Sequence, residues 1–190
     1  MDLYQMVAVH SRPWSEREIL FFGSVILGCV LILLAAVGMH KITKTQALGA
    51  LMILVYMIII FGSTVFTRGV SFRQCELTVF WSWKEALVGH DREMITEILL
   101  NCVMLMPVGI LLPMAVGHRV HPAVALLTGA ILSGTIEVSQ LIFARGLFEW
   151  DDIIHNSLGC MLACVVANSI FKLFQRGRRH LFGRRCSDLR

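Results

Sequence analysis

Five stretches of the chain are long enough and apolar enough to cross a lipid bilayer, which takes about 20 apolar residues for roughly 30 Å of hydrocarbon. They are Ile19–Met39, Ala47–Phe66, Ile95–Met114, Pro122–Phe143 and Ile153–Phe174. Backbone polar groups left unpaired in lipid are costly, and these stretches do not alternate between polar and apolar residues as the strands of a membrane barrel do. We therefore predict an all-α fold, a polytopic transmembrane helical bundle with five spans.

The longest connection between these stretches runs from Thr67 to Met94 and has 28 residues. It carries Phe80, Trp81 and Trp83 among charged residues, and aromatic side chains favour the headgroup zone of a membrane. The pattern predicts that this segment lies along the membrane surface and includes a short amphipathic helix.

The composition supports a membrane protein and excludes several other classes. The chain has 190 residues, of which 56% are hydrophobic and 16% charged, whereas a soluble domain has roughly a quarter charged residues. A high hydropathy also excludes intrinsic disorder. The length is too small for two sizeable cores, so we predict one integral membrane domain over residues 1–190. We expect membrane lipids as partners and no nucleic acid.

The distribution of positive charge predicts an orientation. Seven of the seventeen Lys and Arg residues follow Phe171, so residues 175–190 form a basic tail close to the last span. Lys and Arg next to a span stay on the cytoplasmic side. We therefore expect a multi-pass membrane protein with the C-terminus cytoplasmic and, after five spans, the N-terminus outside.

Polar residues set the last three spans apart from the first two. Glu97 and Asn101 lie four residues apart in the third span, Glu137 and Gln140 lie three apart in the fourth, and Asn156 lies in the fifth. The third span begins, the fourth ends and the fifth begins on one side of the membrane, so these residues share one leaflet. Asn101, Glu137, Gln140 and Asn156 lie about 5–9 Å inside, and Glu97 lies near the surface above them. In the predicted orientation this is the outer leaflet. Ionisable groups inside a membrane indicate a functional site.

Structural roles for the same residues remain open. Asn101 and Gln140 are able to join helices by hydrogen bonds, and Asp151 and Asp152 to cap the fifth helix. His155 is typical of a packing residue. Small residues at three- and four-residue spacing, namely Asn156, Gly159, Ala163 and Ala167, indicate close helix packing.

Glu137 is the deepest carboxylate, and we expect it to lie within reach of Arg145 or of Asn101 and Asn156. A role in binding a divalent cation or in proton transfer is also compatible with the carboxylates. The chain carries no G-x-S-x-G, H-E-x-x-H or C-x-x-C motif. We therefore predict no metal and no cofactor, assign no catalytic residue, and favour a role other than catalysis.

Three segments combine these residues in a distinctive order: ELTVFWSW (Glu76–Trp83), EILLNCVMLMPVGILLP (Glu97–Pro113) and SGTIEVSQLIFARGLFEWDDIIHNSLG (Ser133–Gly159). A Glu and an Asn four apart precede Pro-x-Gly, a Ser…Glu-x-x-Gln helix follows, and an Arg, acidic residues and Asn-x-x-Gly come last. In this order the chain resembles the VanZ-like family of small bacterial membrane proteins over residues 77–159. The resemblance marks one candidate polar cluster: Glu97, Asn101, Glu137, Gln140, Arg145, Glu149, Asp152 and Asn156.

The family is associated by name with teicoplanin resistance, so the resemblance implies a place in the bacterial cytoplasmic membrane and a role in the cell envelope. It implies lower susceptibility to teicoplanin and other lipoglycopeptides, with a cell-wall precursor or the glycopeptide itself as partner. Two departures from the family pattern are Val79, where proline is common, and one extra residue between Arg145 and Asn156. We assign the family's acidic position to Asp152. An intramembrane enzyme acting on a lipid-linked substrate and a non-catalytic membrane scaffold are the alternatives.

Overall fold

The computed structural model describes residues 14–69, 73–90 and 92–187, and from residue 173 onward only the backbone. In this part of the chain, five helical segments are long and apolar enough to cross a membrane. They are Glu16–Gly38, Lys44–Phe66, Arg92–Val116, Pro122–Phe143 and Trp150–Lys172. The predicted all-helical, five-span architecture is confirmed, and the chain is a multi-pass membrane protein.

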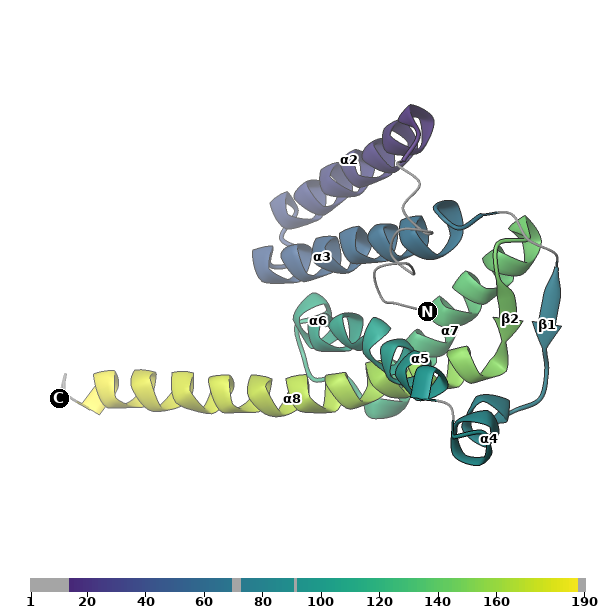
Figure 1. Cartoon of the computed structure of the whole chain (residues 1–190). Helices are drawn as coiled ribbons and strands as arrows, with labels where there is room; N and C mark the ends of the chain where they lie inside the picture. Colours follow the sequence, from purple (N-terminus) through teal and green to yellow (C-terminus); the bar gives the residue numbers. More distant parts are fainter. Residues whose placement is uncertain (1–13, 70–72, 91, 188–190) are drawn as a thin grey trace.

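The first two spans form a helical hairpin at one edge of the molecule (Figure 1). They are α2 (Glu16–Gly38) and α3 (Lys44–Phe61), and α3 continues as a π-helix, η1 (Gly62–Phe66). The Ser15 hydroxyl accepts a hydrogen bond from the Glu18 N–H and the Glu18 carboxylate accepts one from the Ser15 N–H. This reciprocal cap starts α2 just before the first apolar stretch.

The third span consists of two helices rather than the single helix expected over Ile95–Met114. They are α5 (Arg92–Met104) and α6 (Met106–Val116), and the chain bends at the fully buried Leu105. Pro107 causes the break, because proline has no N–H to donate to the preceding turn. The Tyr56 hydroxyl donates to the Met104 carbonyl at 2.7 Å and satisfies one of the groups that the break leaves free.

The last span lies at the centre of the bundle. This helix, α8 (Trp150–Ser187), packs against α5, α6 and α7 (Pro122–Phe143) (Figure 1). A Cβ added at Gly159 would collide with the Cys102 carbonyl, and one at Gly109 would collide with the Cys160 carbonyl. The predicted small-residue packing is thus confirmed at Gly159. The helix continues to Ser187, while the side chains of the predicted basic tail, residues 175–190, lie outside the described part.

The long connection contains β1 (Gln74–Glu76) and α4 (Trp81–Val88), so the expected short helix is confirmed. The sequence analysis missed the strand. β1 pairs in parallel with β2 (Leu147–Glu149), which links α7 to α8 (Figure 1). This pairing brings the long connection against the beginning of α8, on the side where the polar residues of the last three spans gather.

Candidate functional site

A polar cavity of about 140 Å³ lies between α4, α5, β2 and the first turns of α8. Four of the eight predicted residues line it, namely Glu97, Asn101, Glu149 and Asp152. The remaining walls come from Ser82, Met94, Ile98, Leu100 and His155. The structure therefore brings part of the predicted cluster together around one hollow.

Local geometry explains this convergence. Glu97 and Asn101 occupy one face of α5 because they are four residues apart. Asp152 and His155 share one face of α8 because they are three residues apart. The Asn101 side-chain amide donates to the Asp152 carboxylate and ties the two helices together.

Glu137 lies beside the cavity and is only 2% exposed. Its carboxylate accepts a hydrogen bond from the Glu149 N–H at 3.1 Å. The structure thus corrects the expectation that Arg145 or the two asparagines are its partners. Because Glu137 holds the backbone of Glu149, it sets the position of a residue that lines the cavity.

Arg145 also has partners other than those expected. Its guanidinium donates to the backbone carbonyls of Phe66, at 3.1 Å, and of Arg68. Gln140 donates to the Thr64 carbonyl at 3.3 Å. These two predicted residues attach the end of α7 to the end of η1, and neither is among the residues that line the cavity.

Asn156 is fully buried and is not among the residues that line the cavity. Its side-chain N–H₂ donates to the Ser133 hydroxyl at 2.9 Å, which joins α8 to α7. Glu137, Gln140 and Asn156 are therefore buried, and Arg145 half-buried, in polar contacts that do not line the cavity.

The structure separates the two adjacent aspartates. Asp151 is 1% exposed and accepts hydrogen bonds from the Phe80 N–H at 2.6 Å, the Ser82 N–H at 3.0 Å and the Ser82 hydroxyl. It therefore caps α4 rather than its own helix, where the sequence analysis placed its capping role. Asp152 faces the cavity.

Three residues near the site were not part of the predicted cluster. Ser82 and His155 line the cavity, and the Trp83 indole N–H donates to His155 Nε2 at 2.7 Å, so Nε2 carries no proton. The three-residue spacing from Asp152 was a signal for His155. Arg68 interacts electrostatically with Glu137 and Asp152, and no local pattern in the sequence marks it.

The electrostatics of the cavity are dominated by carboxyl groups. Burial raises the pKa of Glu149 to about 7, and the nearby Asp152 carboxylate adds to this rise. Glu149 is therefore able to donate a proton near neutral pH, while the Asp152 carboxylate accepts a hydrogen bond from the Asn101 amide. Among the described residues, no group of three or more His, Cys, Asp and Glu is placed to hold a metal ion.

Comparison with known proteins identifies a family relationship. The model of the VanZ/LLP1 family matches residues 47–173, which is about two thirds of the chain. The match contains the region of residues 77–159 in which the sequence motifs lie, and it also takes in α3 and most of α8. No curated protein and no solved structure gives a significant match.

Proposed function

Because the chain belongs to the VanZ/LLP1 family, we propose that it acts in the bacterial cell envelope and lowers susceptibility to teicoplanin and other lipoglycopeptides. In this proposal the polar cavity binds a component of the outer surface, such as a cell-wall precursor or the glycopeptide. The observation that carries the proposal is the grouping of Glu97, Asn101, Glu149 and Asp152 around one cavity. Polar side chains from separate spans gather in this way where a membrane protein handles a polar ligand.

The chemistry of the walls favours a particular type of ligand group. Three carboxyl groups and an amide line the cavity, so acceptors outnumber donors. Such a site suits hydroxyl, amide N–H or ammonium groups, and it repels phosphate. At about 140 Å³ it is smaller than the roughly 300–1,000 Å³ of most ligand pockets. It therefore takes one small part of a larger envelope component.

The proposal requires the cavity to face outward, with residues 175–190 as a cytoplasmic basic tail. Cys75 provides a test, because it is exposed on β1, beside β2, at the cavity end of the bundle. In a chain whose other cysteines are replaced, a membrane-impermeant maleimide should label Cys75 in intact cells. A chain with His118→Cys as its single cysteine is the control, since the exposed His118 follows α6 at the opposite end of that span. Labelling of His118→Cys but not of Cys75 contradicts an outward-facing cavity.

Gene deletion and complementation test the role itself. Deletion should raise susceptibility to teicoplanin, and the unchanged chain should restore resistance. Asp152→Asn and Glu97→Gln should fail to restore it at normal membrane abundance, because they remove charge from the cavity while conserving shape. Glu16→Gln, at the exposed start of α2, is the matched control and should restore resistance. Unchanged susceptibility after deletion overturns the proposed role.

One observation favours a second candidate, an intramembrane enzyme that acts on a lipid-linked substrate. The Glu149 carboxyl, whose pKa is about 7, lines the cavity together with Asp152, and a carboxyl group that exchanges its proton near neutral pH suits general acid and base catalysis. This candidate predicts that deletion changes the lipid-linked cell-wall intermediates extracted from the cells. Mass spectrometry of these lipids, with Glu149→Gln as the variant, distinguishes catalysis from binding alone.

A further inference from the structure

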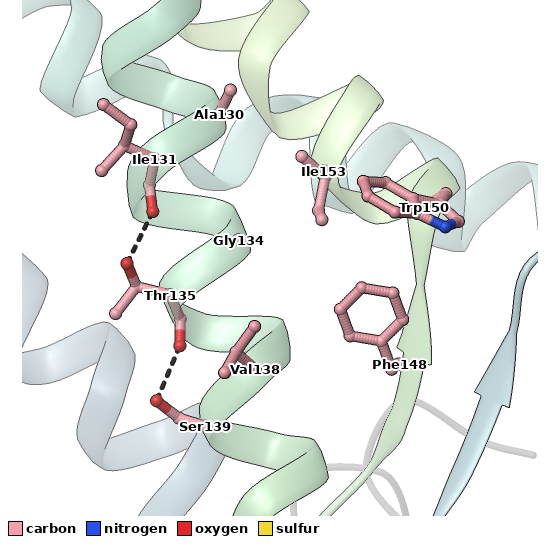
Figure 2. A pocket seen from close by; sticks show the side chains of 9 residues that line it. All are labelled: Ala130, Ile131, Gly134, Thr135, Val138, Ser139, Phe148, Trp150 and Ile153. Atoms are coloured by element: carbon pink, nitrogen blue, oxygen red, sulfur yellow. Dashed lines mark hydrogen bonds between the residues drawn. The ribbon is translucent and has the colours of Figure 1, made fainter.

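A second hollow, an apolar groove of about 550 Å³, runs along the outside of α7. One wall is the stretch of α7 from Ala130 to Ser139, and the other consists of Phe148, Trp150 and Ile153 (Figure 2). The groove is separate from the polar cavity, with which it shares no lining residue.

Gly134 keeps the groove open. A Cβ added there would meet only the Cδ1 atom of Ile153, at 3.9 Å. Figure 2 shows the free space between this part of α7 and the side chains of Phe148 and Trp150. A larger side chain at position 134 would therefore enter the groove without displacing the backbone.

The walls of the groove are almost entirely hydrocarbon. Its two hydroxyl groups are on Thr135 and Ser139, and each donates to the carbonyl one turn earlier in α7, at 2.6 Å (Figure 2). Neither hydroxyl hydrogen is left for a ligand. The groove thus suits an apolar occupant that needs no hydrogen bond.

The position of the groove along the span identifies that occupant. Ser139 lies about 6 Å and Ala130 about 20 Å from the end of α7 at Phe143, so the groove runs roughly through one leaflet. Ile131 is 60% and Val138 47% exposed, which opens the groove toward the membrane. Figure 2 shows Phe148 level with Val138 and Trp150 level with Gly134, so Phe148 lies nearer the Phe143 end of α7 and Trp150 lies deeper along the span.

We propose that this groove binds one acyl chain of a membrane phospholipid, with the lipid headgroup toward the Phe143 end of α7. The surrounding bilayer supplies this ligand at high concentration, and the groove offers a chain more contacts than a convex helix surface does. The volume is within the range of pockets that hold small ligands.

The bound chain also supports the polar cavity. Phe148 and Trp150 flank Glu149 in the sequence, and Ile153 follows Asp152, so the same short segment lines the groove and the cavity. An occupied groove holds this segment against α7. This part of the proposal concerns position only and does not depend on what the cavity binds.

Photolabelling of the whole protein in lipid vesicles tests the proposal. The probe is phosphatidylglycerol with a diazirine in one acyl chain, and the labelled peptides are identified by mass spectrometry. Labelling should concentrate on residues 130–139 and 148–153. Gly134→Leu should lower it there by about tenfold, which corresponds to about 1.4 kcal/mol of binding. Gly28→Leu is the matched control, because a Cβ at Gly28 on α2 meets nothing within 4 Å.

Three results overturn the proposal. Labelling spread evenly over the exposed faces of α2 and α7 indicates ordinary lipid contact. If Gly134→Leu does not reduce the labelling of residues 130–139 and 148–153, the probe binds outside the groove. Cross-linked pairs of chains through the groove indicate a second copy as the occupant. Val138→Trp fills the groove from its open side and repeats the test if Gly134→Leu does not fold. The readout is independent of antibiotic susceptibility, so its failure leaves the proposed envelope role intact.

Discussion

The first span, α2, and the last span, in α8, are both long and apolar enough to cross a membrane, yet they differ in how far the rest of the protein buries them. No residue of α2 is buried, whereas α8 buries Asp151, His155 and Asn156 at 3% exposure or less. A lipid tail is as apolar as leucine, so moving an apolar side chain from lipid into the protein interior yields no hydrophobic free energy. Inside a membrane, polar and small residues rather than apolar ones therefore mark the interior of the protein.

This difference in burial between α2 and α8 is tested most directly by placing the same large side chain in both helices. Gly159→Leu should destabilise the protein by about 4 kcal/mol or more, because a side chain there collides with the Cys102 backbone. Gly23→Leu in α2 should be nearly silent, since a Cβ there meets nothing within 4 Å. Membrane abundance and melting in detergent measure both. Normal abundance of Gly159→Leu contradicts the close packing of α5 on α8.

The two adjacent aspartates sharpen the distinction between structural and functional polar residues within α8. Asp151→Ala should cost about 3 kcal/mol, because it removes a buried carboxylate that accepts hydrogen bonds from Phe80 and Ser82. Asp152→Asn should keep its melting temperature and lose the phenotype defined by gene deletion. The reverse pattern would assign the functional role to Asp151.

Two substitutions of Glu137 distinguish the effect of its charge from that of its hydrogen bond. Glu137→Gln keeps an acceptor for the Glu149 N–H, so abundance and melting should change little. Glu137→Leu leaves that buried N–H unpaired and should cost about 1–3 kcal/mol. If the charge is needed for function, Glu137→Gln abolishes complementation. Full complementation by both Glu137→Gln and Asp152→Asn would leave these residues as contacts between helices, and the scaffold alternative would stand.

A further prediction concerns the pH dependence of stability due to Glu149. Its pKa rises from 4.5 to about 7 on folding, so between these values the folded state binds more protons than the unfolded state. Stability therefore falls as pH rises from about 4.5 to about 7 and changes no further above that range. Melting of the protein and of Glu149→Gln at about pH 5 and about pH 8 checks this. The melting temperature of Glu149→Gln should differ less between the two pH values than that of the unchanged protein. Equal differences would mean that another group titrates.

The resemblance and the helical periodicity predicted part of the site. Glu97 and Asn101 were expected on one face of α5, and Asp152 was chosen over Asp151 as the acid of the cluster. Both placements agree with the lining of the cavity. The partners of Arg145 and Glu137 were not predictable, because they are backbone groups of Phe66, Arg68 and Glu149. A backbone carbonyl or N–H has no signature in the sequence.

The sequence by itself determined the five spans and the end of the bundle at which the polar residues meet. The thickness of the bilayer sets the length of each apolar stretch, and the number of crossings sets which span ends share a side. Only the tertiary structure decided that Asp151 caps α4, that β1 pairs with β2, and that the chain bends at Leu105 with Tyr56 on the freed carbonyl. These contacts join segments 48 residues apart or more, so their energy depends on the packing of the whole bundle rather than on any local pattern.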